Sequence, residues 1–232
     1  MKVSTSFFSS LLLVLFVSTT ALSQQVKDIE REDLQELGES EIMRTKQATE
    51  TKGTPYLNTK FLKGEAIIKG GATTRPMYLR LNTETNTVEI VRNKKVQALD
   101  TKKIEGFRIF TGEDDILFKN GFNNDVKGID KLTFLRIIYD GKTKLVAHHY
   151  SKLKEDLPSY GSATKQNAYV SFLNYYVVDN GEFHKLKMNE NSIMNALSSH
   201  KEKLKTIAQQ NELSLDNEDD VVKLLKKFDQ AN

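Results

Sequence analysis

The sequence predicts an α+β fold, in which an antiparallel β-sheet or open barrel is followed by a small C-terminal helical segment. Two observations carry this prediction. Short alternations of apolar and polar residues, separated by turn residues, recur about every ten residues between residues 53 and 188. From residue 189 onward the apolar residues return at helical spacing instead, which indicates helices over residues 189–232.

The first 23 residues have the layout of a secretory signal peptide. Lys2 precedes an apolar stretch centred on residues 11–17, and Ala21 and Ser23 occupy the positions that a signal peptidase reads. That stretch is too short to span a bilayer, and no later segment reaches the run of about 20 apolar residues that a spanning helix needs. We therefore expect an exported chain, periplasmic or secreted, with no transmembrane segment after cleavage.

Residues 24–52 read as a charged leader that is mobile or weakly helical. They contain few aliphatic residues and no aromatic ones, and Gly38 interrupts the helical spacing. The predicted strands follow from residue 53. In one of them Met77, Leu79 and Leu81 alternate with polar or amphipathic residues, as in a half-buried antiparallel strand. The strand segments are residues 61–69, 77–82, 87–92, 95–99, 104–110 and 116–119.

Two hairpins complete the predicted sheet. They turn at Asp140-Gly141 and at Asn180-Gly181, dipeptides that favour two-residue turns because they tolerate positive φ. Beyond them, residues 193–208 have helical spacing, and residues 215–230 combine an Asp or Asn cap, acids in the first turn and a lysine pair in the last. We expect two or three short helices that pack on the sheet.

Composition narrows the classes of partner and cofactor. The chain has no cysteine, so neither a disulfide nor a cysteine-based site is available. Its formal net charge is only +3, from 34 basic and 31 acidic residues, whereas nucleic-acid binders carry a larger basic excess. The sequence contains neither G-x-S-x-G nor H-E-x-x-H, and no stretch fits a phosphate loop or an EF-hand. We expect no catalytic residue, metal, cofactor or nucleic-acid partner.

Two of the four histidines are adjacent, in the first hairpin. A two-residue loop at Asp140-Gly141 would place His148 opposite Thr133 and His149 opposite Leu132. Successive side chains of a strand point to opposite faces, so the two imidazoles are not expected to share a ligand. The pattern predicts His149 at the edge of the core and His148 on the surface.

The aromatic residues of the second hairpin allow two interpretations. Cross-strand aromatic pairs stabilise a sheet, which is sufficient reason for their presence. Exposed tyrosines also form platforms for glycans or peptides. The second interpretation gives a candidate ligand-binding set of His148, Tyr150, Tyr175, Tyr176 and His184.

Three segments resemble, in order, an uncharacterised family of exported proteins common in Bacteroidetes-type Gram-negative bacteria. They are residues 53–90, the hairpin "YYVVDNGEFHKLK" and the run from His200 to Phe228. The resemblance implies a bacterial envelope or secreted setting and the order of sheet followed by helices. It implies no activity, cofactor or catalytic residue.

Three functional hypotheses follow. The first is a non-catalytic envelope protein whose sheet surface binds another envelope protein or a cell-surface component. The second is an enzyme that brings His148, His184 and the acids of residues 113–130 into one cleft, which requires separations of about 4–6 Å. The third is a carrier for an apolar ligand such as a lipid, which requires a large apolar cavity inside the sheet.

Overall fold

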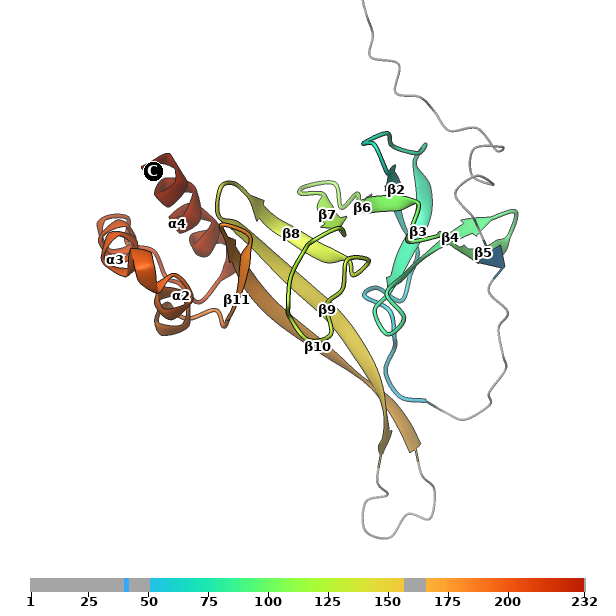
Figure 1. The fold of residues 1–232 in the computed structure, drawn as a ribbon. Helices are drawn as coiled ribbons and strands as arrows, with labels where there is room; N and C mark the ends of the chain where they lie inside the picture. The colour runs from blue at the N-terminus through green and yellow to red at the C-terminus, as the bar shows by residue number, and fades with distance from the viewer. Residues whose placement is uncertain (1–39, 42–50, 157–165, 232) are drawn as a thin grey trace, which may run out of the picture.

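The computed structural model describes residues 40–41, 51–156 and 166–231 (Figure 1). The predicted signal peptide and most of the predicted leader lie outside these ranges. The strands are β1 (Ser40–Glu41), β2 (Leu62–Ile68), β3 (Met77–Asn82), β4 (Thr87–Arg92), β5 (Lys95–Ala98), β6 (Ile104–Ile109), β7 (Ile116–Lys119), β8 (Leu135–Asp140), β9 (Lys144–Asp156), β10 (Gln166–Asp179) and β11 (Glu182–Leu186). The helices are α2 (Glu190–Ala196), a 3₁₀ turn η1 (Ser198–His200), α3 (Lys201–Gln210) and α4 (Glu218–Gln230).

These strands form one antiparallel sheet in the order β1-β5-β4-β3-β2-β6-β7-β8-β9-β10-β11, and the helices gather at the β11 end (Figure 1). The predicted α+β class and antiparallel sheet are confirmed. The open-barrel alternative is wrong, because the sheet keeps two edges, at β1 and β11. β1 pairs with β5, so residues 40–41 of the predicted leader belong to the sheet.

The strands lie where the alternation of apolar and polar residues predicts them. In β3, Leu79 and Leu81 are buried while Tyr78 is 60% exposed. The Asn180-Gly181 turn is also confirmed, because both residues have positive φ and Asp179 pairs directly with Glu182.

The turn between β8 and β9 differs from the prediction. Asp140 pairs with Lys144, so the loop has three residues, and the register shifts between Ile137 and Tyr139. The cause lies in α4. Asp229 accepts hydrogen bonds from the Thr143 backbone N–H, at 3.1 Å, and from the Tyr139 hydroxyl, at 3.0 Å. A contact between residues 86 positions apart therefore fixes the shape of a turn that the local sequence assigns differently.

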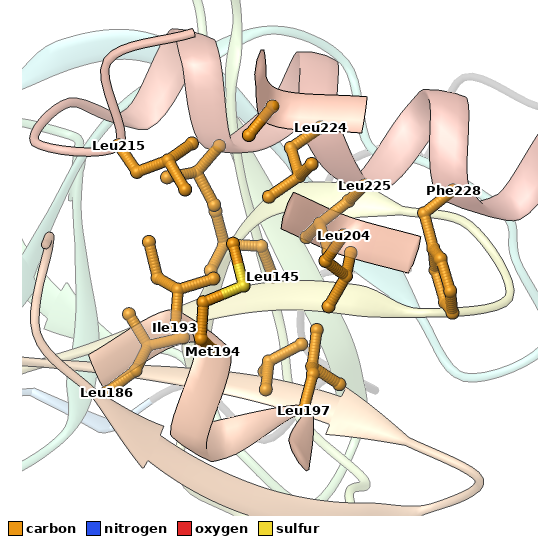
Figure 2. Close-up of a cluster of buried hydrophobic side chains, with 13 residues drawn as sticks. Leu145, Leu186, Ile193, Met194, Leu197, Leu204, Leu215, Leu224, Leu225 and Phe228 are labelled. Carbon is orange, nitrogen blue, oxygen red and sulfur yellow. The ribbon is translucent and has the colours of Figure 1, made fainter. Parts of the chain in front are cut away.

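The interior consists of three clusters of buried apolar side chains. The first lies between the helices and the sheet, where Leu145 and Leu186 face Ile193, Met194 and Leu204 (Figure 2). The second fills the β2–β7 half of the sheet around a stack of Phe107 on Phe118, with ring centroids 4.7 Å apart. The third covers the other face of β8–β10 and includes Ile129, Leu135, Val146, Tyr176 and Val178.

Helix α4 begins as the sequence predicts. The Asn217 side chain caps it by accepting from the Asp220 backbone N–H at 2.9 Å, and three acidic residues occupy the first turn. Both features stabilise the N-terminal end of a helix. Its buried stripe, which packs into the first cluster, consists of Val221, Leu224, Leu225 and Phe228.

A buried ion pair holds the chain segment before β2 on the sheet. Arg80 donates to the Glu89 carboxylate through Nε at 2.9 Å and through a terminal nitrogen at 2.7 Å. Its guanidinium lies 3.5 Å from the ring centroid of Tyr56 and 4.3 Å from that of Phe61. The side chains of Arg80 and Glu89 are only 12% and 5% exposed. Both ends of the pair are therefore largely shielded from water.

Replacing Arg80 by methionine should destabilise the protein strongly, because Glu89 would keep a buried charge without its partner. Removal of one member of a buried pair typically costs about 3–5 kcal/mol. The control is Lys119→Met, which breaks an ion pair to Asp140 whose two side chains are each 41% exposed, and such pairs contribute less than about 1 kcal/mol. Urea unfolding at pH 7 compares the two variants. Equal losses of unfolding free energy in the two variants would contradict the conclusion that the Arg80–Glu89 pair is buried and stabilising.

Candidate functional site

The ribbon of β9 and β10 carries most of the predicted site residues. It runs without interruption from the Lys144–Val178 pair to the Asp156–Gln166 pair. His148 pairs with Asn174 and His149 with Leu173. The predicted pairing of the two histidines with Thr133 and Leu132 is wrong. Strand β8 begins only at Leu135, and Ala147 is the last residue of β9 that pairs with it, so neither histidine has a partner on β8. The two imidazoles nevertheless lie on opposite faces, as alternation requires.

His149 is half-buried at the edge of the core beside Phe118, as predicted, with ring centroids 6.1 Å apart. Its Nε2 atom is buried and has no hydrogen-bond partner among the described residues. Burial, and to a lesser extent the charge of Arg136, lower the pKa of His149 to about 4, while Glu218 acts in the opposite direction. His149 is therefore neutral near pH 7, and packing accounts for its position.

His148 lies in a row of stacked rings on the other face. Its ring centroid is 5.0 Å from that of Tyr150, which is 4.9 Å from that of Phe172 on the neighbouring strand. The ammonium groups of Lys152 and Lys154 lie 5.7 Å from the Tyr150 centroid and 5.5 Å from the Phe172 centroid. His148 is half-buried, rather than on the surface as predicted, and burial lowers the pKa of its imidazole. We call His148, Tyr150 and Phe172 the aromatic row.

Two members of the aromatic row, His148 and Tyr150, line an open groove of about 730 Å³. Sites for small molecules commonly have volumes of this size. One wall comes from the β3–β4 turn and the other from the long loop after β7. The lining residues are Thr83, Glu84, Asn86, Lys127, Gly128, Thr133, His148, Tyr150, Ser151, Lys152, Leu153, Asn174 and Tyr176. We call this the β9–β10 groove; it includes three of the five predicted binding residues.

Hydrogen bonds fix the first wall. The Asn86 side chain donates to the Leu132 carbonyl at 2.8 Å and accepts from the Phe134 backbone N–H at 2.9 Å. The Thr83 hydroxyl lies within hydrogen-bond distance, 3.0 Å, of the Ser151 hydroxyl on β9. The wall is therefore tied both to the β9–β10 ribbon and to the chain that enters β8, which makes the groove a preformed feature.

Tyr175 does not join the groove, because it points to the opposite face from Tyr176. Its hydroxyl donates to Glu218 of α4 at 2.8 Å, and the same carboxylate accepts two hydrogen bonds from Arg136, at 2.9 and 3.0 Å. Burial, followed by the hydrogen bond and the charge of Glu218, raises the pKa of Tyr175 to about 12. Tyr175 thus fastens the start of α4 to the sheet.

His184 is also separate from His148. His184 lies on the edge strand β11 and pairs with Val177 of β10. Because Val177 faces the helices, His184 lies on the face of the sheet that carries them. Its Nε2 is 3.8 Å from the Glu182 carboxylate, and together with Asp125 it lines a second pocket, of about 490 Å³. The cleft required by the enzyme hypothesis, which combines His148 with His184, is therefore not formed by these residues.

Several groove residues carry no local signal in the sequence. Thr83 and Glu84 belong to a turn, and Lys127 belongs to an acidic, Asn-rich loop that reads as an ordinary solvated connection. They reach the groove only through the order of strands in the sheet. The sequence does contain a signal for Asn174. The β10–β11 turn fixes the register of β10, and alternation then places Asn174 on the same face as Tyr176.

Within residues 40–41, 51–156 and 166–231, no group of three or more histidines and acids is arranged to hold a metal ion. None of the helices in these ranges is long and apolar enough to cross a membrane. The side chains that line the β9–β10 groove offer a ligand neutral hydrogen-bonding groups, aromatic rings, two lysines and the Glu84 carboxylate.

Acid should destabilise the protein through His149. Its pKa in the folded state, about 4, lies below the ordinary value of 6.5, so folding favours the neutral imidazole. Stability is full above pH 6.5 and falls as the pH drops from 6.5 to 4, by up to about 3 kcal/mol from this group. The measurement is urea unfolding of the protein and of His149→Gln from pH 8 to pH 4.

The difference in unfolding free energy between the two proteins should shift in favour of the variant as the pH falls. An NMR titration of His149 with a midpoint near 6.5 would contradict the assignment.

Comparison with models of known protein families, with curated proteins and with solved structures finds no match.

Proposed function

We propose that this protein is an exported, non-catalytic component of the cell envelope that binds a ligand of the envelope or cell surface in the β9–β10 groove. The observation that carries the proposal is the stacked pair of His148 and Tyr150, which lies half-buried in the lining of an open groove beside the polar side chain of Asn174. The predicted signal peptide and the family resemblance supply the exported setting.

The composition of the groove favours recognition of a polar ligand that also has flat apolar surfaces. Aromatic side chains provide large apolar contact areas with little loss of conformational entropy. His148, Tyr150, Asn174 and Tyr176 add hydrogen-bonding groups on the same face of two paired strands. A site on rigid strands needs little reorganisation on binding, which lowers the entropic cost of association.

The same composition argues against the apolar-ligand alternative. A lipid carrier needs an apolar cavity inside the sheet. The interior of the described sheet is instead filled by aromatic and aliphatic side chains, such as Phe107, Phe118 and Phe134, each at most 1% exposed. The groove borders the third cluster through Tyr176 and has lysines at its sides.

A truncation in the aromatic row should weaken binding without unfolding the protein. Amide spectra of the isotope-labelled mature protein, recorded during titration with a soluble extract of the producing envelope, should change at His148, Tyr150, Asn174 and Tyr176. Tyr150→Ala should weaken the response by about tenfold, which corresponds to about 1.4 kcal/mol.

The matched control is Tyr78→Ala, because Tyr78 is an exposed tyrosine on β3 that does not line the groove. It should bind as the wild type does. Thermal unfolding of both variants verifies that they fold. Spectral changes confined to other surfaces, or an unchanged response of Tyr150→Ala, would rule out the groove as the binding site.

A further inference from the structure

The groove offers hydrogen-bonding groups that the protein itself leaves unused. Among the described residues, neither the His148 imidazole nor the Tyr150 hydroxyl takes part in a hydrogen bond. Because burial lowers the pKa of His148, its ring is neutral near pH 7 and has one donor and one acceptor nitrogen. The Tyr150 hydroxyl likewise both donates and accepts. Such groups match ligand hydroxyls, which also donate and accept.

The charge of the groove is positive. Lys127 and Lys152 line it, both are exposed, and neither forms an ion pair with a described residue. The one carboxylate of the lining, Glu84, interacts with the Tyr169 hydroxyl, whose pKa it helps to raise after burial. Lys154 adds a third ammonium beside Phe172. An anionic group on the ligand would therefore meet two lysine ammonium groups without an ion-pair partner, against the single carboxylate of Glu84 in the lining.

The side chains of the floor favour a saccharide over an extended peptide. Peptides that bind sheets usually add a strand to an exposed edge, where main-chain hydrogen bonds provide affinity. Along the groove β9 continues beyond its last pair with β8, and on that edge the Ser151 backbone N–H already donates to the Thr83 carbonyl at 3.3 Å. The face of the ribbon presents the side chains of His148, Tyr150 and Asn174. Side chains that combine rings with hydroxyl, amide and imidazole groups suit the alternating C–H and hydroxyl surfaces of a sugar.

We infer that the ligand of the β9–β10 groove is an acidic saccharide of the uronic-acid type, an inference that rests on the function proposed above. Its hydroxyls bind His148, Tyr150 and Asn174, and its carboxylates bind Lys127 and Lys152. The C–H faces of the sugar rings pack on the rings of His148 and Tyr150.

Calorimetric titration of the mature protein with three kinds of trimer tests this inference. The probes are linear uronic-acid trimers (galacturonic, glucuronic and mannuronic), the methyl esters of the same trimers, and triglutamate. At least one acidic trimer should bind, its ester at least tenfold more weakly, and triglutamate at least tenfold more weakly. Binding of the acidic trimer should weaken as salt is raised, because exposed charges are screened.

Two variants probe the lysines directly. Lys127→Met and Lys152→Met should each reduce the affinity for the acidic trimer at least threefold while leaving that for the ester unchanged. Lys142→Met is the matched control, because Lys142 is an exposed lysine outside the groove lining, and it should bind as the wild type does.

Each contrary result has a defined meaning. Equal binding of acid and ester would overturn the requirement for charge, and equal binding of triglutamate would overturn the saccharide. If no trimer binds while an envelope extract still perturbs the groove residues in the amide spectra, the ligand class is wrong and the proposed function stands. If the extract perturbs only other surfaces, the proposed function fails as well.

Discussion

The pairing of β9 with β10 is the constraint on which the rest of this structure depends. The pairing runs from Lys144–Val178 at one end to Asp156–Gln166 at the other, and every other part of the C-terminal half is built on it. One face of the ribbon presents Leu145 and Val177 to the helices, and the other presents Val146 and Tyr176 to the third cluster. The same two strands then continue past the end of β8 to form the groove floor.

Helix α4 is fixed to this ribbon and to β8 at both of its ends. Near its start, Glu218 accepts hydrogen bonds from Arg136 and Tyr175. Near its end, Asp229 accepts from Tyr139 and from the backbone of Thr143. Each carboxylate also lies next to apolar packing, so the polar contacts set the position of the helix while burial of its stripe supplies most of the stabilisation.

Local patterns predicted most of the fold because they depend on neighbours in the chain. Alternation identified β2 to β7, and Asn180-Gly181 identified the β10–β11 turn, since positive φ at both residues is a local requirement. The prediction of a two-residue turn at Asp140-Gly141 was wrong because this turn depends on a residue far away in the chain. Its geometry is set by Asp229, which local patterns do not connect to it. Turn propensity is a small free-energy difference, and two hydrogen bonds to one carboxylate outweigh it.

The candidate site likewise contains residues that local patterns predicted and residues that they missed. Alternation separated His148 from His149 correctly even though their predicted partners were wrong, because alternation does not depend on register between strands. It also implies that Tyr175 and Tyr176 point to opposite faces, which the combined set of candidate residues ignored. Thr83, Glu84 and Lys127 were missed because only the order of the strands brings the β3–β4 turn and the loop after β7 to the ribbon.

The opposite placement of the two histidines also separates binding from stability. His149 faces Phe118 at the edge of the core, where a change of volume or charge acts on folding. His148 faces the groove and contacts mainly the ring of Tyr150, where a change acts on the ligand surface. Because the ladder of β9 and β10 holds both through backbone hydrogen bonds, the two faces of the ribbon can be altered independently. The ribbon thus holds the half-buried rings of His148 and Tyr150 in a fixed arrangement beside the third cluster.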